Sequence, residues 1–479
     1  MTGNLRQGGA GLGAWDRGSL GRGKEVGLWE WVAPFAYGRW WMAFRARASR
    51  LVPSLLISMA GPQIWDSLPS ELHKPVPWEG CSMALSLPEC DVFVVVGEPS
   101  GDAYAAAVIS ELQRQYPDLR VAAAACEGVR AAGAEIDVDM SGYAVMGFVA
   151  VFKRLAEFRR LGRQVARIIR ARRPRVVITV DYPGFNLRLL AHLQDLRQSG
   201  CVFCHVVAPQ VWAWKPRRAK KVAQLVDQLC CFFPFEPPLF TRHGGAASFV
   251  GHPLVDQMPK PSAEANRAAR QRLGIAADID VLLMAPGSRE HEVSSLLPLF
   301  DEAYAMVAHR LRGPRPILPL IAKAPALDHA LYRRFSHHRL VEGGYREILA
   351  CARAGMIASG TATLEAALAG VPHLIAYRGD TLSATIAKHV ILTDHVGLPN
   401  IVHARRVCPE ILQDQCTAIR LAAHLERMWR GPVHNATCTS LLATRDRLGS
   451  GGAISRIAAL IAPHLKGAGD RRRDSTIGV

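Results

Sequence analysis

From residue 91 onward, short apolar runs alternate with amphipathic stretches. Five runs have the character of buried strands and lie at 91–96, 121–125, 176–180, 201–207 and 228–233. A second series follows at 281–285, 316–321, 354–358 and 373–376. Strands that are apolar almost throughout and alternate with helices are typical of a parallel sheet covered on both faces. The pattern therefore predicts an α/β fold with two doubly wound, Rossmann-like domains facing a central cleft.

Breaks in this pattern set the expected domain boundaries. Residues 251–262 (GHPLVDQMPKPS) are rich in proline and polar residues, which is typical of an interdomain linker. The chain of 479 residues is also too long for one ordinary core. We expect domains at 83–255 and 256–410, C-terminal helices at 411–465 and a flexible tail at 466–479.

Residues 1–82 differ from the remainder, because they are rich in Gly, Trp and Arg and show no regular alternation. Part of this region fits an interfacial amphipathic segment or a targeting peptide. Met83, however, stands just before the first convincing strand. We expect Met83 to approximate the start of the folded protein, and residues 1–82 to be an atypical extension, either disordered or a non-native start.

The net charge of +17 favours phosphorylated or acidic partners, namely nucleotides, nucleic acid or an anionic membrane face. Past the first eighty residues, no apolar run is long enough to cross a bilayer. The eleven cysteines form no pair of CxxC units, which indicates buried free thiols in a reducing compartment.

The turn GEPSGD (97–102) follows the first strand. Gly97 and Gly101 flank it, and Asp102 is placed to cap the following helix. A simple strand-to-helix turn would explain this pattern, but it would not explain why Glu98 stands at the strand's carboxyl edge, facing the predicted cleft. Ser100 belongs to the same turn.

A second turn, VDYPGFN (180–186), places Asp181 directly after a buried strand, with Asn186 at the start of the next helix. A carboxylate at that edge can act as a general base towards an acceptor hydroxyl. The alternative is a helix cap, and the spacing alone leaves both open.

The stretch APQVWAWKPRRAKK contains Gln210, Trp212 and Trp214, followed by Lys215, Arg217, Arg218, Lys220 and Lys221. Aromatic rings beside a basic cluster suit a sugar or base next to a phosphate. A solvated basic helix start explains the composition equally well.

In PGSREHEV, three kinds of chemistry compete. Ser288 lacks the GxSxG elbow of a serine nucleophile. His291 and Glu292 lack the second histidine of HExxH, because residue 295 is Ser, so a zinc site is excluded. What remains is a helix start with backbone N–H groups, the Ser288 hydroxyl and the Arg289 guanidinium, a combination that binds phosphate.

A similar turn, Ser359-Gly360-Thr361, opens another helix in the second series, with Glu365 four residues further on. It offers a second anion-binding helix start, with Glu365 free to accept hydrogen bonds from ribose hydroxyls. Two such turns in one half favour a phosphorylated ligand more strongly than either turn alone.

The triplets DVD at 137–139 and DID at 278–280 are interpreted as solvated turn residues, so no metal is implied. Residues 146–175 hold ten Lys/Arg residues interleaved with apolar ones. This basic segment suits an anionic membrane surface, and part of its apolar face would cover the sheet. Nucleic acid is the competing partner, but no recognised nucleic-acid motif is present.

Together these blocks resemble the lipid-A-disaccharide synthases, inverting glycosyltransferases of the GT-B fold. The resemblance runs from about Val92 to about His464 and rests on GEPSGD, YAVMGFVAVFKRL, VDYPGFN, APQVWAWKPRR, FPFE, FVGHPLVD, PGSREHEV, ASGTATLEAALAGVPHLIAYR and VGLPNIV. It implies transfer of 2,3-diacylglucosamine from its UDP derivative to 2,3-diacylglucosamine 1-phosphate (lipid X). The product would be the β-1,6-linked disaccharide 1-phosphate, and UDP would leave.

The resemblance also implies roles for single residues. Asp181 matches the proposed general base, and Arg289 and Glu365 match residues linked to donor binding and activity. Gly184 stands where the family often has a second acidic residue, which leaves Asp181 as the only carboxylate of that motif.

The expected site residues fall into four groups. Asp181, Arg289 and Glu365 are the catalytic candidates. The 256–410 domain would bind the donor through Gly287, Ser288, Ser359, Gly360, Thr361, Tyr377 and Asn400. The 83–255 domain would hold the acceptor and face the membrane, with acceptor contacts at Glu98, Ser100, Asn186, Gln210 and Trp212. The lipid surface would include Phe148, Phe152, Lys153, Arg154, Arg159 and Arg160.

No metal or other cofactor is expected, since Arg289 and helix-start N–H groups can stabilise the leaving UDP. The family is peripheral on the cytoplasmic side of the inner membrane and forms dimers, so we expect this location, a possible homodimer and no nucleic-acid partner. Two alternatives remain. One is a related UDP-sugar enzyme, such as an epimerase or a transferase with a soluble acceptor. The other is a non-enzymatic basic protein, which would not need two phosphate-type turns.

Overall fold

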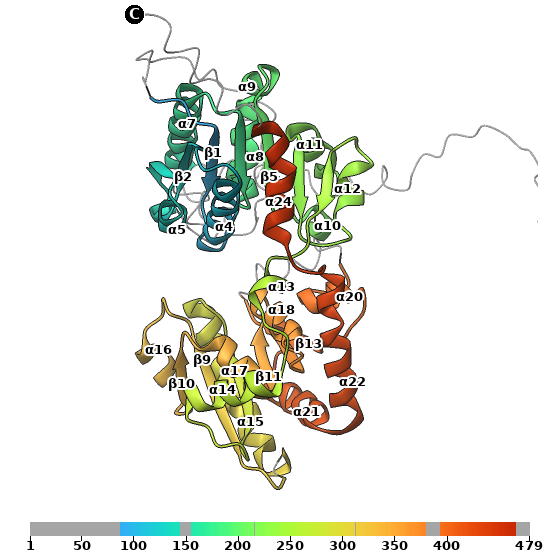
Figure 1. The fold of residues 1–479 in the computed structure, drawn as a ribbon. Helices are drawn as coiled ribbons and strands as arrows, with labels where there is room; N and C mark the ends of the chain where they lie inside the picture. Colours follow the sequence, from blue (N-terminus) through green and yellow to red (C-terminus); the bar gives the residue numbers. More distant parts are fainter. Residues whose placement is uncertain (1–86, 144–154, 215, 312, 380–392, 466–479) are drawn as a thin grey trace, which may run out of the picture. The chain divides into compact units, whose positions relative to one another are not determined.

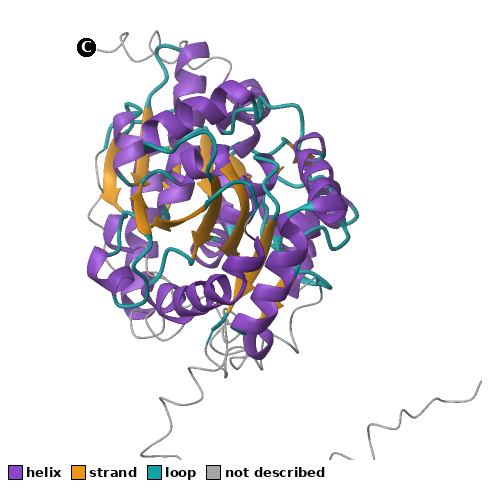
Figure 2. Ribbon diagram, turned by 90° about the horizontal axis from the view of Figure 1, so that it is seen from below, coloured by secondary structure: helices purple, strands orange, loops and turns teal. Residues whose placement is uncertain are grey.

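The computed structural model describes residues 87–143, 155–214, 216–311, 313–379 and 393–465. The segments expected at 1–82 and 466–479 lie outside these ranges. Two parallel sheets, each accompanied by helices, form the described chain (Figures 1 and 2). The predicted fold class, a pair of doubly wound Rossmann-like sheets, is confirmed, whereas the domain boundaries stay a prediction.

The first sheet has seven strands in the order β3-β2-β1-β4-β5-β6-β7. Its elements in chain order are β1 (Val92–Val96), α4 (Pro99–Gln115), β2 (Val121–Ala125), α5 (Glu127–Ala131), β3 (Glu135–Asp139), η2 (Ser141–Tyr143), α7 (Leu155–Arg172), β4 (Val176–Val180), α8 (Pro183–His192), α9 (Gln194–Gln198), β5 (Val202–Val206), α10 (Val211–Trp214), α11 (Arg218–Leu225), β6 (Gln228–Cys231), α12 (Pro237–Thr241) and β7 (Ala247–Phe249).

The second sheet has six strands in the order β10-β9-β8-β11-β12-β13. Its elements are α13 (Leu254–Gln257), α14 (Ala263–Leu273), β8 (Asp280–Ala285), α15 (Glu290–Leu311), β9 (Ile317–Lys323), α16 (His329–Arg333), β10 (Arg339–Glu342), α17 (Tyr345–Cys351), β11 (Ala352–Ala358), α18 (Thr361–Leu368), β12 (His373–Tyr377), α20 (Leu398–His403), β13 (Glu410–Leu412), η3 (Gln413–Gln415), α21 (Ala418–Trp429), α22 (Gly431–Leu442), α23 (Thr444–Arg447), α24 (Ala453–Ile461) and η4 (Ala462–Leu465).

Alternate residues of each central strand pack on opposite faces of its sheet. In β1, Val94 packs with Ile109 of α4, whereas Val95 packs with Val165 of α7 on the other face. The second sheet repeats this arrangement, with α15 and α21 on one face and α17 and α18 on the other. Burying each such aliphatic side chain stabilises the fold by roughly 1.5–3 kcal/mol, which explains why these strands are apolar throughout.

Four strands were not expected from the sequence, and all four are at sheet edges: β3, β7, β10 and β13. The interpretation of 137–139 as a solvated turn was wrong, because these residues belong to β3. There Asp137 accepts two hydrogen bonds from the fully buried Arg172 guanidinium, at 2.9 and 2.6 Å. The same interpretation was wrong for Asp280, which is buried at the start of β8.

The chain after β13 is helical, as expected, and its last helix returns to the first sheet. Both sheets belong to one compact unit of the chain. α24 packs against α4 (Figure 1), and the Tyr116 hydroxyl donates to the Ala462 carbonyl at 3.3 Å. Within α24, Arg456 Nε donates to the Val250 carbonyl at 2.8 Å. The C-terminal helices therefore tie the linker region to the first half.

Cys201, Cys204, Cys230 and Cys231 are buried free thiols, as the sequence predicted.

Candidate active site

The candidate residues of the first half follow β1 and β4, which are neighbours in the sheet. Val96 pairs with Val180 at the carboxyl ends of these strands, so Glu98 and Asp181 leave the sheet at the same edge. The strand order reverses between β1 and β4. Ligands of doubly wound proteins bind outside such a switch point.

Asp181 occupies a strained turn. Its φ is 47° and that of Tyr182 is 50°, which places two consecutive non-glycine residues in the left-handed region. Asn186 is fully buried, and its Nδ2 donates to the carbonyls of Val180 at 3.2 Å and Asp181 at 2.7 Å. Asn186 was expected to contact the acceptor. The structure places it beneath the turn, where its amide holds the backbone that carries Asp181.

At this edge the charge of the Asp181 carboxylate acts on the carboxyl group of Glu98. Burial raises the pKa of the Asp181 carboxyl, and the hydrogen bond from the Tyr182 backbone lowers it. Burial also raises the pKa of Glu98, to which the negative charge of Asp181 adds, while the Arg289 guanidinium lowers it. Glu98 therefore supplies a second carboxyl group near Asp181, although position 184 is Gly.

Packing around the turn explains the two glycines of GEPSGD (97–102). A Cβ on Gly97 would lie 2.7 Å from the Tyr182 ring, and one on Gly101 would lie 2.8 Å from Val96 Cγ2. The expectation that Asp102 caps its own helix was wrong. The buried Asp102 carboxylate accepts from the Cys126 and Gly128 N–H groups, at 2.9 and 2.7 Å, and so caps α5.

Ser100 is exposed in the first turn of α4. Gln210 is exposed just before α10.

Trp212 is anchored by a buried acid. Its Nε1 donates to Glu236 Oε1 at 3.2 Å, and its ring makes an edge contact with Phe235. Glu236 also accepts from the Phe232 and Phe233 N–H groups, and burial raises its pKa to about 7. The FPFE stretch thus fixes the orientation of Trp212, a role for which residue spacing gave no signal.

In the second half, the two glycine turns follow β8 and β11, again the pair at which strand order reverses. Ala285 pairs with Ile357, so both turns emerge at the same edge. The sequence predicted that each turn opens a helix, and α15 and α18 do begin there.

The turn at 286–289 already holds an anion from its own helix. Glu292 Oε2 accepts from the N–H groups of Ser288 at 3.0 Å and Arg289 at 3.2 Å. Glu292 Oε1 accepts from Arg289 Nη1 at 3.0 Å. A Cβ on Gly287 would collide with the same carboxylate. The N–H groups expected to meet a phosphate are therefore occupied by Glu292, whereas Ser288 and Arg289 are themselves exposed residues.

The turn at 359–361 is built differently. Gly360, with a φ of 149°, is the N-cap of α18, and this helix has no side-chain cap. Thr361 and Gly360 are exposed, and Ser359 is half-buried. Glu365 Oε1 accepts from Arg346 Nε at 2.9 Å and lies 2.8 Å from Arg346 Nη2. This helix start can therefore present its N–H groups outward.

Tyr377 ends β12 and is half-buried. Asn400, expected to bind the donor, is fully buried. Its Nδ2 donates to the Cys408 carbonyl and to Glu410, and its Oδ1 accepts from the Val407 and Cys408 N–H groups. Through these hydrogen bonds within the protein, the Asn400 side chain holds the loop that leads into β13.

Tyr104 was missed from the sequence. Burial, together with the carboxylates of Glu365 and Asp181, raises the pKa of its hydroxyl to about 12. Its ring makes an edge contact with Phe232, at 5.4 Å between centroids. The sequence offered little indication of Tyr104, because it lies two residues beyond GEPSGD in a helix whose pattern predicts only packing against the sheet.

Of the predicted lipid surface, Phe148, Phe152, Lys153 and Arg154 lie outside the described residues, and Arg159 and Arg160 are exposed on α7. None of the helices in the described part of the chain has the length and apolar character of a membrane span. Across the described ranges, no three His, Cys, Asp or Glu side chains gather as a metal site would require.

Known proteins match the chain over most of its length. A family model described as lipid-A-disaccharide synthetase matches residues 92–436. The lipid-A-disaccharide synthase of Geobacter metallireducens is 36% identical over 381 residues, which cover 79% of this chain and 98% of that protein.

Solved structures agree on the fold. A UDP-GlcNAc 2-epimerase from Neisseria meningitidis bound to UDP-GlcNAc has a TM-score of 0.53 at 12% identity, covering 78% of this chain and 100% of the other. The calicheamicin glycosyltransferase CalG4 has a TM-score of 0.51 at 18% identity, covering 80% and 100%. At these identities the likeness shows the GT-B fold alone.

Proposed function

The chain belongs to the lipid-A-disaccharide synthase family and is therefore a glycosyltransferase, and from that premise we propose its substrates and mechanism. The donor is UDP-2,3-diacylglucosamine and the acceptor is 2,3-diacylglucosamine 1-phosphate. The products are the β-1,6-linked disaccharide 1-phosphate and UDP. The observation that carries this proposal is the position of Asp181, at the switch point of the first sheet and in a strained, partly buried turn.

Asp181 is the general base. Its ionised carboxylate takes the proton from the acceptor 6-hydroxyl while the 6-oxygen forms a bond to the donor's anomeric carbon. The bond from that carbon to the UDP oxygen breaks, and its electron pair leaves with UDP. Attack from the face opposite to UDP inverts the configuration. Burial supports this role, because a raised pKa makes the carboxylate a stronger base.

The second sheet binds UDP, and its two turns contribute differently. The uncapped start of α18, with Ser359, Gly360 and Thr361, receives the pyrophosphate. The positively charged Arg289 guanidinium stabilises the negative charge that develops on the leaving oxygen of UDP. Because Glu292 occupies the N–H groups of Ser288 and Arg289, these two groups do not serve the phosphate unless that carboxylate moves.

Glu365 and Tyr104 complete the proposed site. The carboxylate of Glu365 accepts hydrogen bonds from the donor ribose, and Arg346 holds it in place through Oε1. Burial and the carboxylates of Glu365 and Asp181 raise the pKa of the Tyr104 hydroxyl, which supports a position for it between the proposed donor and acceptor sites. No metal or other cofactor is part of this mechanism.

The acylated substrates reside in a membrane, so we propose that the protein works as a peripheral protein on the cytoplasmic face of the inner membrane. The basic α7 region, including Arg159 and Arg160, faces that surface. A homodimer stays a prediction.

The test is incubation with the diacylated donor and acceptor, with the product mass measured. We expect Asp181→Ala to keep UDP affinity and to lose about 10²–10⁴-fold in turnover, the range of general-base contributions. The control is Asp278→Ala, which removes an exposed carboxylate before β8 and should leave turnover unchanged. Near-normal turnover of Asp181→Ala would sink the assignment. Comparable activity on UDP-N-acetylglucosamine would favour an enzyme with a soluble substrate instead.

A further inference from the structure

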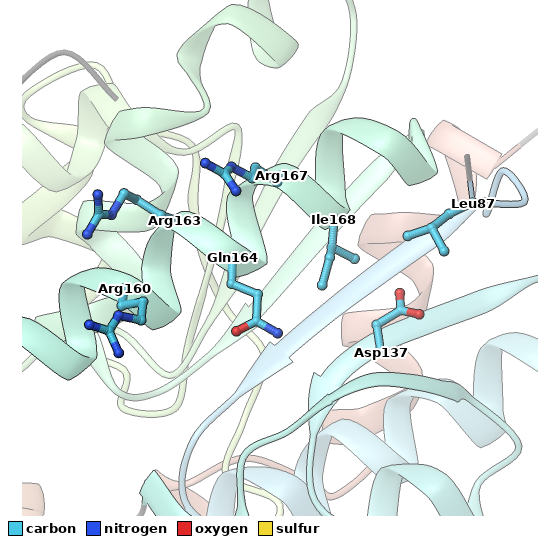
Figure 3. Close-up of a pocket in the computed structure, with 7 residues that line it drawn as sticks. All are labelled: Leu87, Asp137, Arg160, Arg163, Gln164, Arg167 and Ile168. Carbon is cyan, nitrogen blue, oxygen red and sulfur yellow. The ribbon is translucent and has the colours of Figure 1, made fainter. Parts of the chain in front are cut away.

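A cavity of about 630 Å³ lies beside α7, and neither Asp181 nor its turn is among the residues that line it. Figure 3 shows its lining residues, which are Leu87, Asp137, Arg160, Arg163, Gln164, Arg167 and Ile168. Three of the seven are arginines with exposed side chains. None of the roles proposed for the active site uses this cavity.

The three arginines share one face of the helix, because Arg163 is three residues and Arg167 seven residues beyond Arg160. Like charges at these spacings repel, at roughly 0.2–0.5 kcal/mol per neighbouring pair. They also lie away from the last turn of α7, where the helix dipole would stabilise a cation. The fold alone therefore gives no reason for three positive charges there.

The same helix shows how its other arginines are satisfied. Arg170 donates to both carboxylate oxygens of Asp195, each at 3.0 Å. Arg172 binds both oxygens of Asp137 and the Pro88 carbonyl. Within the described residues, Arg160, Arg163 and Arg167 make no ion pair or side-chain hydrogen bond.

Asp137, which lines the cavity, and Glu135 both bind Arg172, so with Arg172 counted four guanidinium groups stand against two carboxylates and the cavity stays positive. The remaining wall consists of Gln164 and of the apolar side chains of Leu87 and Ile168, the latter only 7% exposed. Cationic groups beside an apolar wall suit a ligand that joins an anionic phosphate to a hydrocarbon portion.

We propose that this cavity binds the phosphate of an anionic phospholipid headgroup. The guanidinium groups of Arg160, Arg163 and Arg167 would contact the phosphate, and the glycerol end of the lipid would lie against Leu87 and Ile168. The proposal rests on the membrane location proposed above, not on the assignment of Asp181. It goes beyond a diffuse basic surface, because it places headgroup recognition in one cavity with three named side chains.

The experiment compares two triple variants of the full chain. The first is Arg160→Gln, Arg163→Gln and Arg167→Gln. The second is Arg334→Gln, Arg339→Gln and Arg427→Gln, which removes the same charge from exposed side chains around the second sheet. Co-sedimentation is measured with vesicles of equal parts phosphatidylglycerol and phosphatidylcholine, and with vesicles of phosphatidylcholine alone.

We expect the cavity variant to lose about a hundredfold in affinity for the anionic vesicles, since each basic residue near such a surface contributes about fivefold. The matched variant should change less than about threefold, and neither should bind phosphatidylcholine alone. Circular dichroism should be unchanged for both, because the substituted side chains are exposed.

Equal losses in both variants would overturn the proposal, because net charge would then explain binding. Inorganic phosphate is titrated into the unsubstituted protein and the cavity variant without vesicles; if it bound the unsubstituted protein as tightly as the anionic vesicles do, and the cavity variant lost that binding, the ligand would be a soluble phosphate and the proposal would be overturned. Disaccharide formation by the unsubstituted protein is measured separately in detergent. If that reaction is absent but the vesicle result holds, the proposed function fails and the cavity assignment survives.

Discussion

The two glycine turns of the second sheet have similar sequences and different occupants. At 286–289, the N–H groups of Ser288 and Arg289 already bond a carboxylate, that of Glu292. At 359–361, α18 begins without a side-chain cap. Both turns leave the same edge of the sheet, so topology does not distinguish them.

The difference teaches that a helix start is an anion site only if its own first turn leaves the N–H groups open. Glu292 is the third residue of α15, from which a carboxylate can reach back to the helix start. The corresponding residue of α18 is Thr363, whose hydroxyl donates to the Gly360 carbonyl and presents no negative charge. The third residue of the helix therefore decides whether the donor phosphate must compete with a protein carboxylate for the N–H groups of the helix start.

The glycines of the two turns should respond unequally to alanine, and this is the largest expected effect. Gly287 has a φ of 117°, and a Cβ there would lie 2.7 Å from Glu292 Cβ. Gly360 also has a positive φ, but nothing lies within 4 Å of its Cβ position. We expect Gly287→Ala to lower the free energy of unfolding by about 3 kcal/mol and Gly360→Ala by about 1 kcal/mol, measured in urea.

Gly184→Ala is the control for this pair. Gly184 is exposed in α8 with open space around its Cβ position, so alanine there should leave stability unchanged or raise it by about 0.5–1 kcal/mol. Equal losses for Gly287→Ala and Gly360→Ala would show that Glu292 does not fill the first turn as described.

Substituting the carboxylates beside the two turns should lower stability in one case and weaken donor binding in the other. In Glu292→Gln an amide replaces the carboxylate, and the N–H side of that amide faces donors that lose their acceptor. This costs about 1–3 kcal/mol of folding free energy. Glu365→Gln weakens a partly exposed ion pair with Arg346, worth about 0.2–1 kcal/mol, but removes the proposed acceptor for the donor ribose.

We therefore expect Glu292→Gln to lower the urea midpoint more, and Glu365→Gln to raise the donor KM more. Glu290→Gln, an exposed acid in the same first turn of α15, should change neither. The contrast between the turns would be refuted by a Glu292→Gln protein of unchanged stability.

The sequence predicted the inner strands and missed the four edge strands, of which β3 and β10 carry charge and β7 and β13 are only three residues long. Strands such as β1 and β8 are buried on both faces, so their residues form apolar runs. Two of the edge strands, β3 (EIDVD) and β10 (RLVE), carry charged side chains, which discourage pairing with other chains. A charged strand at an edge looks like a connector, and so Asp137 was assigned to a turn.

The candidate site was predictable to the extent that strand ends determine it. Asp181, Ser288 and Thr361 could be placed because each follows a recognisable strand. The partner of a side chain could not be read in this way. Asp102 caps a different helix, and the amide of Asn400 makes its hydrogen bonds to the loop at 407–410. Such partners come from tertiary packing, which spacing along the chain does not encode.

The smallest effect, and the most direct comparison of the turns, is on UDP affinity measured by calorimetry. Thr361→Ala removes a hydroxyl at an uncapped helix start and should weaken UDP binding about fivefold, the value of one neutral hydrogen bond. Ser288→Ala should change it less than about twofold, because Glu292 occupies this turn and the phosphate is expected at the open start of α18. Arg289→Ala is the reference, with an expected loss of more than tenfold for a charge-assisted contact. If Ser288→Ala weakened UDP binding as much as Thr361→Ala, the donor would displace Glu292, and the first turn would be a phosphate site that its own glutamate keeps closed until UDP arrives.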